Sequence, residues 1–127
     1  MMEPGLKGVA ARTVERADTA LEIGSGSMLV FATPALAALM ERAACEAIAE
    51  ELEEGWTSVG TRLELSHDAA TPVGMEVRAE AELIEADGRK LVFEIDAFDE
   101  KGPIGKGRHE RFLVQEERFL AKTYEKL

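Results

Sequence analysis

The chain of 127 residues is poor in cysteine and has no long apolar run, and each shortage excludes a class of protein. A single cysteine, Cys45, cannot form a disulfide within the chain, which is typical of the cytoplasm. No run of roughly 18 apolar residues is present, so we expect no membrane span. The first residues also lack the basic flank and apolar run of a secretory signal. We therefore expect a cytoplasmic protein.

Positive charge is scarce too, because 15 basic residues stand against 25 acidic ones and give a net charge of −10. This balance argues against nucleic acid and anionic membranes as partners. The charge is uneven, however, since residues 101–127 hold 7 basic and 4 acidic residues. A locally basic segment suits a small ligand that carries phosphate. Charge balance within a dimer is the simpler explanation for most of these residues.

One long helix is predicted, over residues 34–54. Thr33 is a suitable N-cap, Pro34 suits the first helical position, and Gly55 is a natural C-cap. The segment is rich in alanine, so the helix can lie close to a sheet. No repeat or second domain is apparent, and we expect one domain over residues 1–127 with a loose arm at residues 1–7.

From residue 56 the apolar period changes from 3.6 to 2, which predicts antiparallel strands. Asp87-Gly88 is a strong hairpin signal between two of them. We predict long strands at residues 56–67, 75–83, 91–97 and 104–116, short extended pieces at 8–14 and 19–23, and a short helix at 117–126. One helix against one curved sheet gives an α+β fold.

Two polar residues fall where apolar ones are expected. Glu41 lies on the apolar stripe of the predicted helix, and His67 lies on the apolar face of the first long strand. Facing each other, they would form an acid–base pair. Each also has a simpler reading, as a Glu that reaches solvent at the helix edge and as a satisfied core histidine. No third ligand has metal-site spacing, so we expect no metal.

Several motifs resemble the fluoroacetyl-CoA thioesterase family of hotdog proteins. They lie between about residues 10 and 120, and the most specific is Ser66-His67-Asp68-Ala69-Ala70-Thr71-Pro72-Val73-Gly74; the others are Val30-Phe31-Ala32-Thr33, Met40-Glu41, Ser58-Val59-Gly60-Thr61 and Gly107-Arg108-His109-Glu110-Arg111. The resemblance implies a hotdog fold, a homodimer and hydrolysis of an acyl-CoA thioester. Coenzyme A would be part of the substrate, and no separate cofactor is implied.

The resemblance also implies site residues. Thr33, Glu41 and His67 would be catalytic, with either Thr33 or Glu41 bonding to the acyl group. The backbone N–H of Gly60 would help to hold the thioester carbonyl, and Arg108 or Arg111 would meet the phosphates of coenzyme A.

The sequence departs from this family just before the predicted helix. The fluoroacetyl-specific member has aromatic residues there that gate its pocket, whereas Gly24 and Ser27 stand at those positions here. This suggests an acyl group other than fluoroacetyl. Three alternatives remain open, namely a hotdog enoyl-CoA hydratase, a non-catalytic acyl-CoA-binding module and a dimeric domain whose internal polar residues only satisfy one another.

Overall fold

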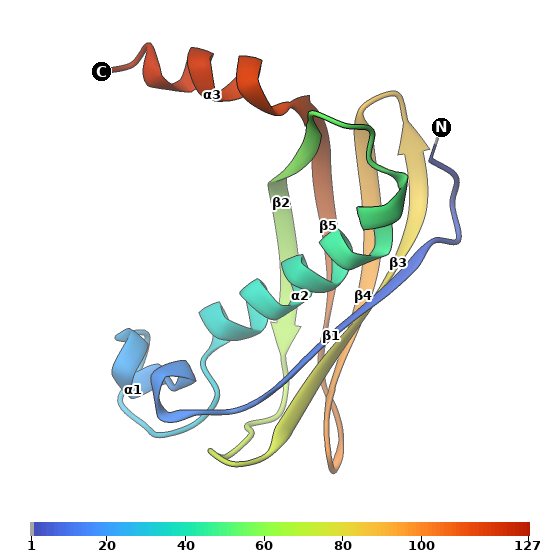
Figure 1. Cartoon of the computed structure of the whole chain (residues 1–127). Helices are drawn as coiled ribbons and strands as arrows, with labels where there is room; N and C mark the ends of the chain where they lie inside the picture. The colour runs from blue at the N-terminus through green and yellow to red at the C-terminus, as the bar shows by residue number, and fades with distance from the viewer. Residues whose placement is uncertain (1) are drawn as a thin grey trace.

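One helix and one curved sheet make up most of the molecule (Figure 1). The computed structural model describes residues 2–127. Its elements are β1 (Lys7–Thr13), α1 (Ala20–Ile23), α2 (Thr33–Ile48), β2 (Trp56–His67), β3 (Glu76–Asp87), β4 (Lys90–Asp99), β5 (Gly102–Gln115) and α3 (Glu116–Tyr124), with 3-10 turns at Arg16–Asp18 and Ala49–Glu51. This arrangement confirms the predicted α+β class with a central helix wrapped by an antiparallel sheet.

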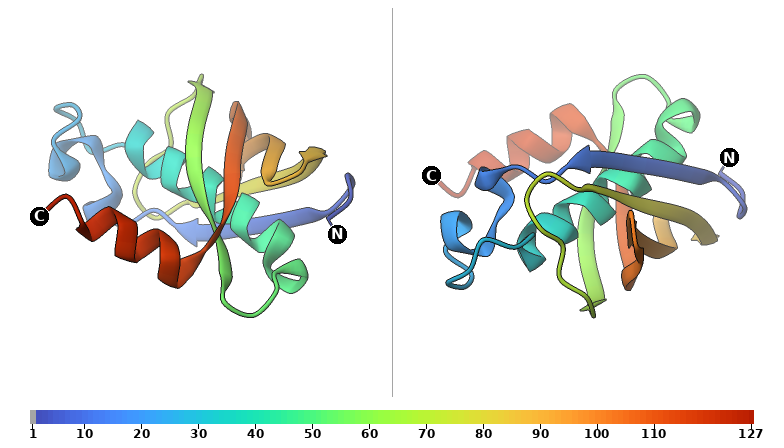
Figure 2. Two further views of the ribbon diagram at one scale, coloured as in Figure 1. Left: turned by 90° about the horizontal axis from the view of Figure 1, so that it is seen from above. Right: turned by 90° about the horizontal axis from the view of Figure 1, so that it is seen from below.

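The sheet has the strand order β1-β3-β4-β5-β2, and all of its pairs are antiparallel. It curls around α2, as Figures 1 and 2 show from different sides. β2 is an edge strand, because it pairs only with β5. An edge strand presents unpaired backbone groups to a further strand.

The core lies between the inner face of the sheet and a stripe along α2. The helix contributes seven buried residues at helical spacing: Leu36, Leu39, Met40, Ala43, Ala44, Ala47 and Ile48. Small residues on this stripe allow a close approach. A β-carbon at Gly8 of β1 would collide with the backbone of Ala43 and Ala47, so only glycine fits there.

The predicted long strands and terminal helix are confirmed, with ends that differ by a few residues. Gly88 turns the predicted hairpin with φ +61°, which glycine adopts at no steric cost. The long helix ends earlier than predicted, because α2 stops at Ile48 and one 3-10 turn carries the chain to Glu51.

The extended piece predicted at residues 19–23 is wrong. Thr19 accepts a hydrogen bond from the backbone N–H of Glu22, and Gly24 ends the turn with φ +92°. These two caps favour the single helical turn α1 over a strand. At the N-terminus, Gly5 and Leu6 exchange backbone hydrogen bonds with Leu83, so from Gly5 onward the chain is attached to the sheet and is not a loose arm.

The regular alternation predicted along β2 is interrupted by a bulge. Gly60 pairs with Arg111 and Arg62 pairs with Glu110, which leaves Thr61 as the extra residue. Ser58 and Gly60 therefore face the helix together with His67. An uninterrupted alternation along the strand would have put Val59 on that face instead.

α3 leaves the sheet at the end of β5 and extends beyond the edge strand β2 (Figures 1 and 2). All of its residues are exposed to solvent in the single chain. Within residues 2–127, no helix is long and apolar enough to cross a membrane.

Candidate active site

Thr33 and His67 form a direct hydrogen bond, with 2.8 Å between Thr33 Oγ1 and His67 Nδ1. Thr33 was predicted to cap α2, and this is wrong, because Ala32 is the N-cap and Thr33 is the first helical residue. At that position its hydroxyl does not cap a backbone N–H of the helix. It points instead to the end of β2, where His67 is the last residue.

The surroundings of His67 favour the neutral form of its imidazole. Partial burial lowers its pKa below the ordinary value of 6.5, and the Phe31 ring meets it edge-on with centroids 6.3 Å apart. A neutral ring that accepts the Thr33 proton at Nδ1 carries its own proton at Nε2. That Nε2 atom is buried and has no hydrogen-bond partner within residues 2–127.

A small pocket of about 260 Å³ opens beside this pair. Thr33 and His67 line it together with Phe31, Ala69 and Ser25 of the loop that follows α1. A hydroxyl that is hydrogen-bonded to a neutral imidazole next to a pocket is the arrangement that activates an oxygen nucleophile.

Glu41 lies elsewhere, about 12 Å further along α2 than Thr33 at 1.5 Å rise per residue. Its predicted burial is wrong, because the side chain sits at the helix edge and is 45% exposed. Within one chain, no hydrogen bond or ion pair joins Glu41 to His67 among residues 2–127. The predicted acid–imidazole pair is therefore not formed inside a single copy.

Glu41 instead meets a buried arginine and the second histidine. Its Oε2 atom lies 3.4 Å from Arg111 Nη1 and 3.9 Å from His109 Nε2. A β-carbon at Gly60 would stand 2.5 Å from the same oxygen, so the backbone of Gly60 lies against the carboxylate. Glu41 and Gly60 thus adjoin each other within one chain.

Arg111 is only 7% exposed, and each of its three guanidinium nitrogens has a hydrogen-bond partner. Nε and Nη2 donate to the hydroxyl and carbonyl of Ser58 at 2.8 and 3.0 Å, and Nη1 donates to His109 Nε2 at 3.2 Å. A guanidinium held in this way restrains the Glu41 carboxylate from the sheet side. Few of its N–H donors are left for the phosphate contact expected of Arg111.

His109 supports this network from the core. Its Nδ1 donates to the carbonyl oxygen of Arg62 at 2.7 Å, which leaves Nε2 as the acceptor for Arg111. Burial lowers the pKa of His109, which favours the neutral ring. Sequence reasoning missed its part and that of Ser58. The two-residue spacing of His109 and Arg111, which puts both side chains on one face of a strand, is the signal that could have found the pair.

Arg108, the other expected phosphate contact, lies on the far side of the sheet between two acidic residues. In the strand register it lies opposite Glu64 of β2 on one side and opposite Glu94 of β4 on the other. Cross-strand carboxylates on both sides make this surface a poor place for a phosphate.

Comparison with known proteins identifies the family. Residues 14–117 match the model of the FlK family, described as fluoroacetyl-CoA-specific thioesterase. The chain belongs to this family. It is also 43% identical over 97 residues to the fluoroacetyl-CoA thioesterase of Streptantibioticus cattleyicolor, a match that covers 76% of this chain and 70% of that protein. The predicted family and the predicted enzyme class, an acyl-CoA thioester hydrolase, are confirmed.

Crystal structures of FlK-family proteins and other hotdog proteins share the fold. An FlK mutant in complex with acetyl-CoA superposes with a TM-score of 0.93 at 35% identity, covering 98% of both chains. A hot-dog-like protein from Thermanaerovibrio acidaminovorans gives a TM-score of 0.88 at 25% identity, covering 99% of this chain and 93% of that one. These likenesses confirm the predicted hotdog fold.

Proposed function

We propose that this FlK-family protein hydrolyses an acyl-CoA, other than fluoroacetyl-CoA, to the free acid and coenzyme A at a site shared between two copies of the chain. The observation that carries the proposal is the hydrogen bond between Thr33 and His67 beside a pocket. A hydrolase needs a nucleophile and a base in contact, and this pair supplies both.

In the proposed reaction, His67 Nδ1 takes the proton of the Thr33 hydroxyl as Thr33 Oγ1 attacks the thioester carbonyl carbon. The C–S bond then breaks, and the proton moves from His67 to the departing thiolate of coenzyme A. Water, deprotonated by the same imidazole, hydrolyses the acyl-threonine and restores Thr33. A neutral imidazole is required at the start, which suits the lowered pKa of His67.

The unsatisfied Nε2 atom of His67 favours a second copy as the source of a carboxylate. A buried N–H without an acceptor is costly, whereas Glu41 offers a half-exposed carboxylate at the edge of the single chain. If β2 pairs antiparallel with β2 of a second copy about a point between Leu63 and Glu64, His67 comes to lie opposite Gly60 of that copy. Glu41 of the second copy then stands beside the Thr33–His67 pair.

This dimer would also place the remaining expected groups. The backbone N–H of Gly60 from the second copy would point at the thioester carbonyl and stabilise the negative charge that develops on its oxygen. Arg111 would hold Glu41 in position and keep it from rotating away. The paired β2 edges would no longer be open to unwanted strands.

The proposed acyl group is inferred from residues 21–28, the segment next to the pocket. Gly24 and Ser27 supply no ring that could close the entrance, and the neighbouring Leu21 and Met28 are 44% and 66% exposed. Exposed aliphatic side chains beside a pocket suit an apolar acyl group that reaches past the small fluoroacetyl unit. The relatives named for fluoroacetyl-CoA would then differ from this protein in substrate and share its chemistry.

A panel of acyl-CoA esters tests the proposal, with release of coenzyme A followed by a thiol reagent. We expect an apolar acyl group larger than acetyl to give a higher kcat/KM than fluoroacetyl-CoA. Preference for fluoroacetyl-CoA would contradict the specificity, and binding of esters without cleavage would indicate a binding module instead of a hydrolase.

Mixing two inactive variants tests whether the site is shared. His67→Ala and Glu41→Ala protomers, denatured and refolded together, form mixed dimers in which one of the two sites has every group intact. We expect the mixture to recover about a quarter of wild-type activity, by random pairing, while each variant alone stays inactive. A mixture no more active than its parts would place the whole site within one chain.

A further inference from the structure

One residue of the surface segment that follows His67 is buried. Residues 68–74 leave the end of β2, and all of them except Thr71 are exposed to solvent. Thr71 is 0% exposed, and it carries the only polar side chain among residues 69–74. A buried polar side chain is expected to have a specific hydrogen-bond partner. The segment belongs to the most specific motif of the sequence, of which the proposed reaction uses only His67.

The partner of Thr71 is the carboxylate of Asp99, at the end of β4. Thr71 Oγ1 donates to Asp99 Oδ2 at 2.7 Å, and the backbone N–H of Lys101 donates to Asp99 Oδ1 at 2.8 Å. Burial acts to raise the pKa of Asp99, yet the hydrogen bonds from Thr71 and from nearby backbone N–H groups hold it below the ordinary value. Thr71 therefore donates to an ionised acceptor, and such charge-assisted bonds are roughly twice as strong as neutral ones.

The backbone of Thr71 is bonded to the segment that enters α2. The N–H of Phe31 donates to the carbonyl oxygen of Thr71 at 2.9 Å, and Val30 and Pro72 form an antiparallel bridge beside it. Phe31 is itself buried, and its ring meets the imidazole of His67 edge-on. Phe31 also lines the small pocket of about 260 Å³. Thr71 thus connects a carboxylate on β4 to a wall of this pocket.

Both members of the reacting pair lie close in sequence to this connection. Thr33 follows Phe31 by two residues, and His67 precedes Thr71 by four. Thr33 begins α2 and His67 ends β2, so the two side chains come from different elements. The backbone bond between Phe31 and Thr71 joins the two segments beside the pair. A shift of either segment would change the 2.8 Å distance from Thr33 Oγ1 to His67 Nδ1, on which proton transfer depends.

We propose that Asp99 and Thr71 are positioning residues, which hold the Thr33 hydroxyl and the His67 imidazole at hydrogen-bonding distance. Neither Asp99 nor Thr71 is among the residues that line the pocket, so they act through the backbone of the two segments that carry the pair. The effect on turnover rests on the proposed function, whereas the positioning is a property of the folded chain.

Removal of the Thr71 hydroxyl tests the proposal in turnover. Thr71→Val keeps the shape of the side chain. We expect kcat for the best acyl-CoA to fall about tenfold with KM little changed, because a small displacement of the reacting groups slows the reaction without altering substrate contacts. Thr71→Ser, which keeps the hydroxyl, should restore most of kcat. Adding Asp99→Ala to Thr71→Val should lower kcat little further, since both changes remove the same hydrogen bond. A wild-type kcat in Thr71→Val, or a Thr71→Ser variant equally slow, would overturn the proposal.

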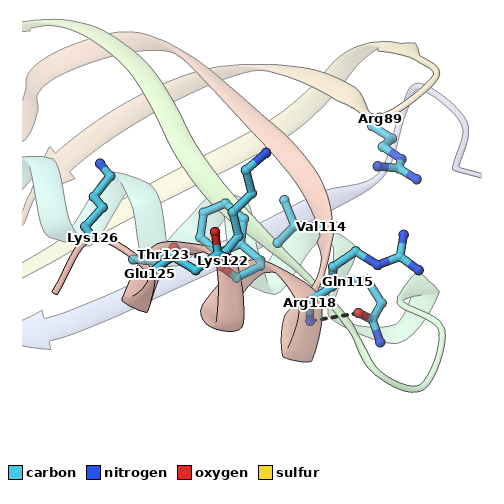
Figure 3. Close-up of a pocket in the computed structure, with 9 residues that line it drawn as sticks. Arg89, Val114, Gln115, Arg118, Lys122, Thr123, Glu125 and Lys126 are labelled. Atoms are coloured by element: carbon cyan, nitrogen blue, oxygen red, sulfur yellow. Dashed lines mark hydrogen bonds between the residues drawn. The ribbon is translucent and has the colours of Figure 1, made fainter.

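Thr123→Val is the matched control. Thr123 lies on α3 beside a groove of about 600 Å³ (Figure 3), which no residue of the Thr33–His67 pocket lines. Its hydroxyl donates to the carbonyl oxygen of Phe119 at 2.8 Å, so this substitution also removes one hydrogen bond. We expect kcat to stay at the wild-type value. A fall equal to that of Thr71→Val would show that the loss is not specific to Thr71 and would overturn the proposal.

Nitrogen NMR of the imidazoles separates this inference from the proposed hydrolysis. The chain has only two histidines, and Nδ1 of His67 accepts a hydrogen bond where Nδ1 of His109 donates one. In Thr71→Val we expect the Nδ1 resonance of His67 to move toward its position in Thr33→Val, with His109 unchanged. If the wild type cleaves no acyl-CoA, the proposed function fails and this resonance alone decides the inference. A His67 resonance in Thr71→Val identical to that of the wild type would overturn it.

Discussion

The two histidines of this chain lie under the same helix, yet their surroundings differ in the feature that matters for chemistry. His109 is 1% exposed, and both of its ring nitrogens have partners in the core. His67 lies beside a pocket with one nitrogen on the Thr33 hydroxyl and the other without a partner. Burial lowers the pKa of both rings, so a shifted pKa alone does not distinguish a reacting imidazole from a structural one. Unfilled hydrogen-bonding capacity next to a pocket does.

The comparison is tested most strongly by removing each imidazole in turn. His67→Ala should lower kcat/KM by about 10² to 10⁴-fold, because the base that activates Thr33 is lost. Its melting temperature should stay close to that of the wild type, since a half-buried side chain with one hydrogen bond is removed. Thiol-release kinetics and thermal unfolding on the same sample check both parts. Full turnover in this variant would remove His67 from the mechanism.

His109→Ala should show the converse pattern in stability. The substitution leaves a cavity against Phe93 and removes partners from the Arg62 carbonyl and from Arg111, so we expect a loss of about 2–4 kcal/mol in the free energy of unfolding. Urea unfolding measures it. His109→Gln, which can restore one hydrogen bond, is the matched control and should lose less. A His109→Ala protein as stable as the wild type would contradict a structural role.

These differences mark where prediction from sequence succeeded and where it failed. The long helix and the four long strands followed from apolar periods and from the Asp87-Gly88 turn, which are local properties. The site depends on where a few single side chains point, and the apolar periodicity of the sequence does not fix this. The bulge at Thr61 shifts Ser58 and Gly60 onto the helix face, and the N-cap at Ala32 releases the hydroxyl of Thr33.

The position of the Glu41 side chain was also beyond what the sequence pattern could predict. A helical wheel placed it on the buried stripe, but the stripe is narrower than predicted, and Arg111 draws the carboxylate toward the edge. The partner of Glu41 sits seventy residues away in the sequence, on β5. Such a pairing depends on the register of two strands, which the apolar pattern alone does not set.

Arg111→Met sharpens the comparison by acting on the network around His109 without touching His67. If Arg111 positions Glu41, kcat should fall about tenfold or more while KM for the acyl-CoA changes little. If Arg111 gripped phosphate, KM would rise and kcat would hold. Steady-state kinetics with acyl-CoA and with acyl-pantetheine decide between these outcomes. Arg108→Met is the matched control on the same strand, and we expect near wild-type values for it.

The smallest expected effect is on the pH dependence of stability. For both histidines the pKa is lower in the folded protein than the ordinary 6.5, chiefly because burial disfavours the charged ring. The unfolded chain therefore binds more protons as pH falls through 6.5, and folding stability decreases until the folded-state pKa values are passed. His109→Gln should flatten the curve of unfolding free energy against pH.

Activity should also fall at low pH, because a protonated His67 cannot accept the Thr33 proton. His109→Gln should leave this fall in kcat/KM in place, whereas His67→Gln should remove it from the residual activity. A fall that survives the loss of His67 would assign the reacting base to another group.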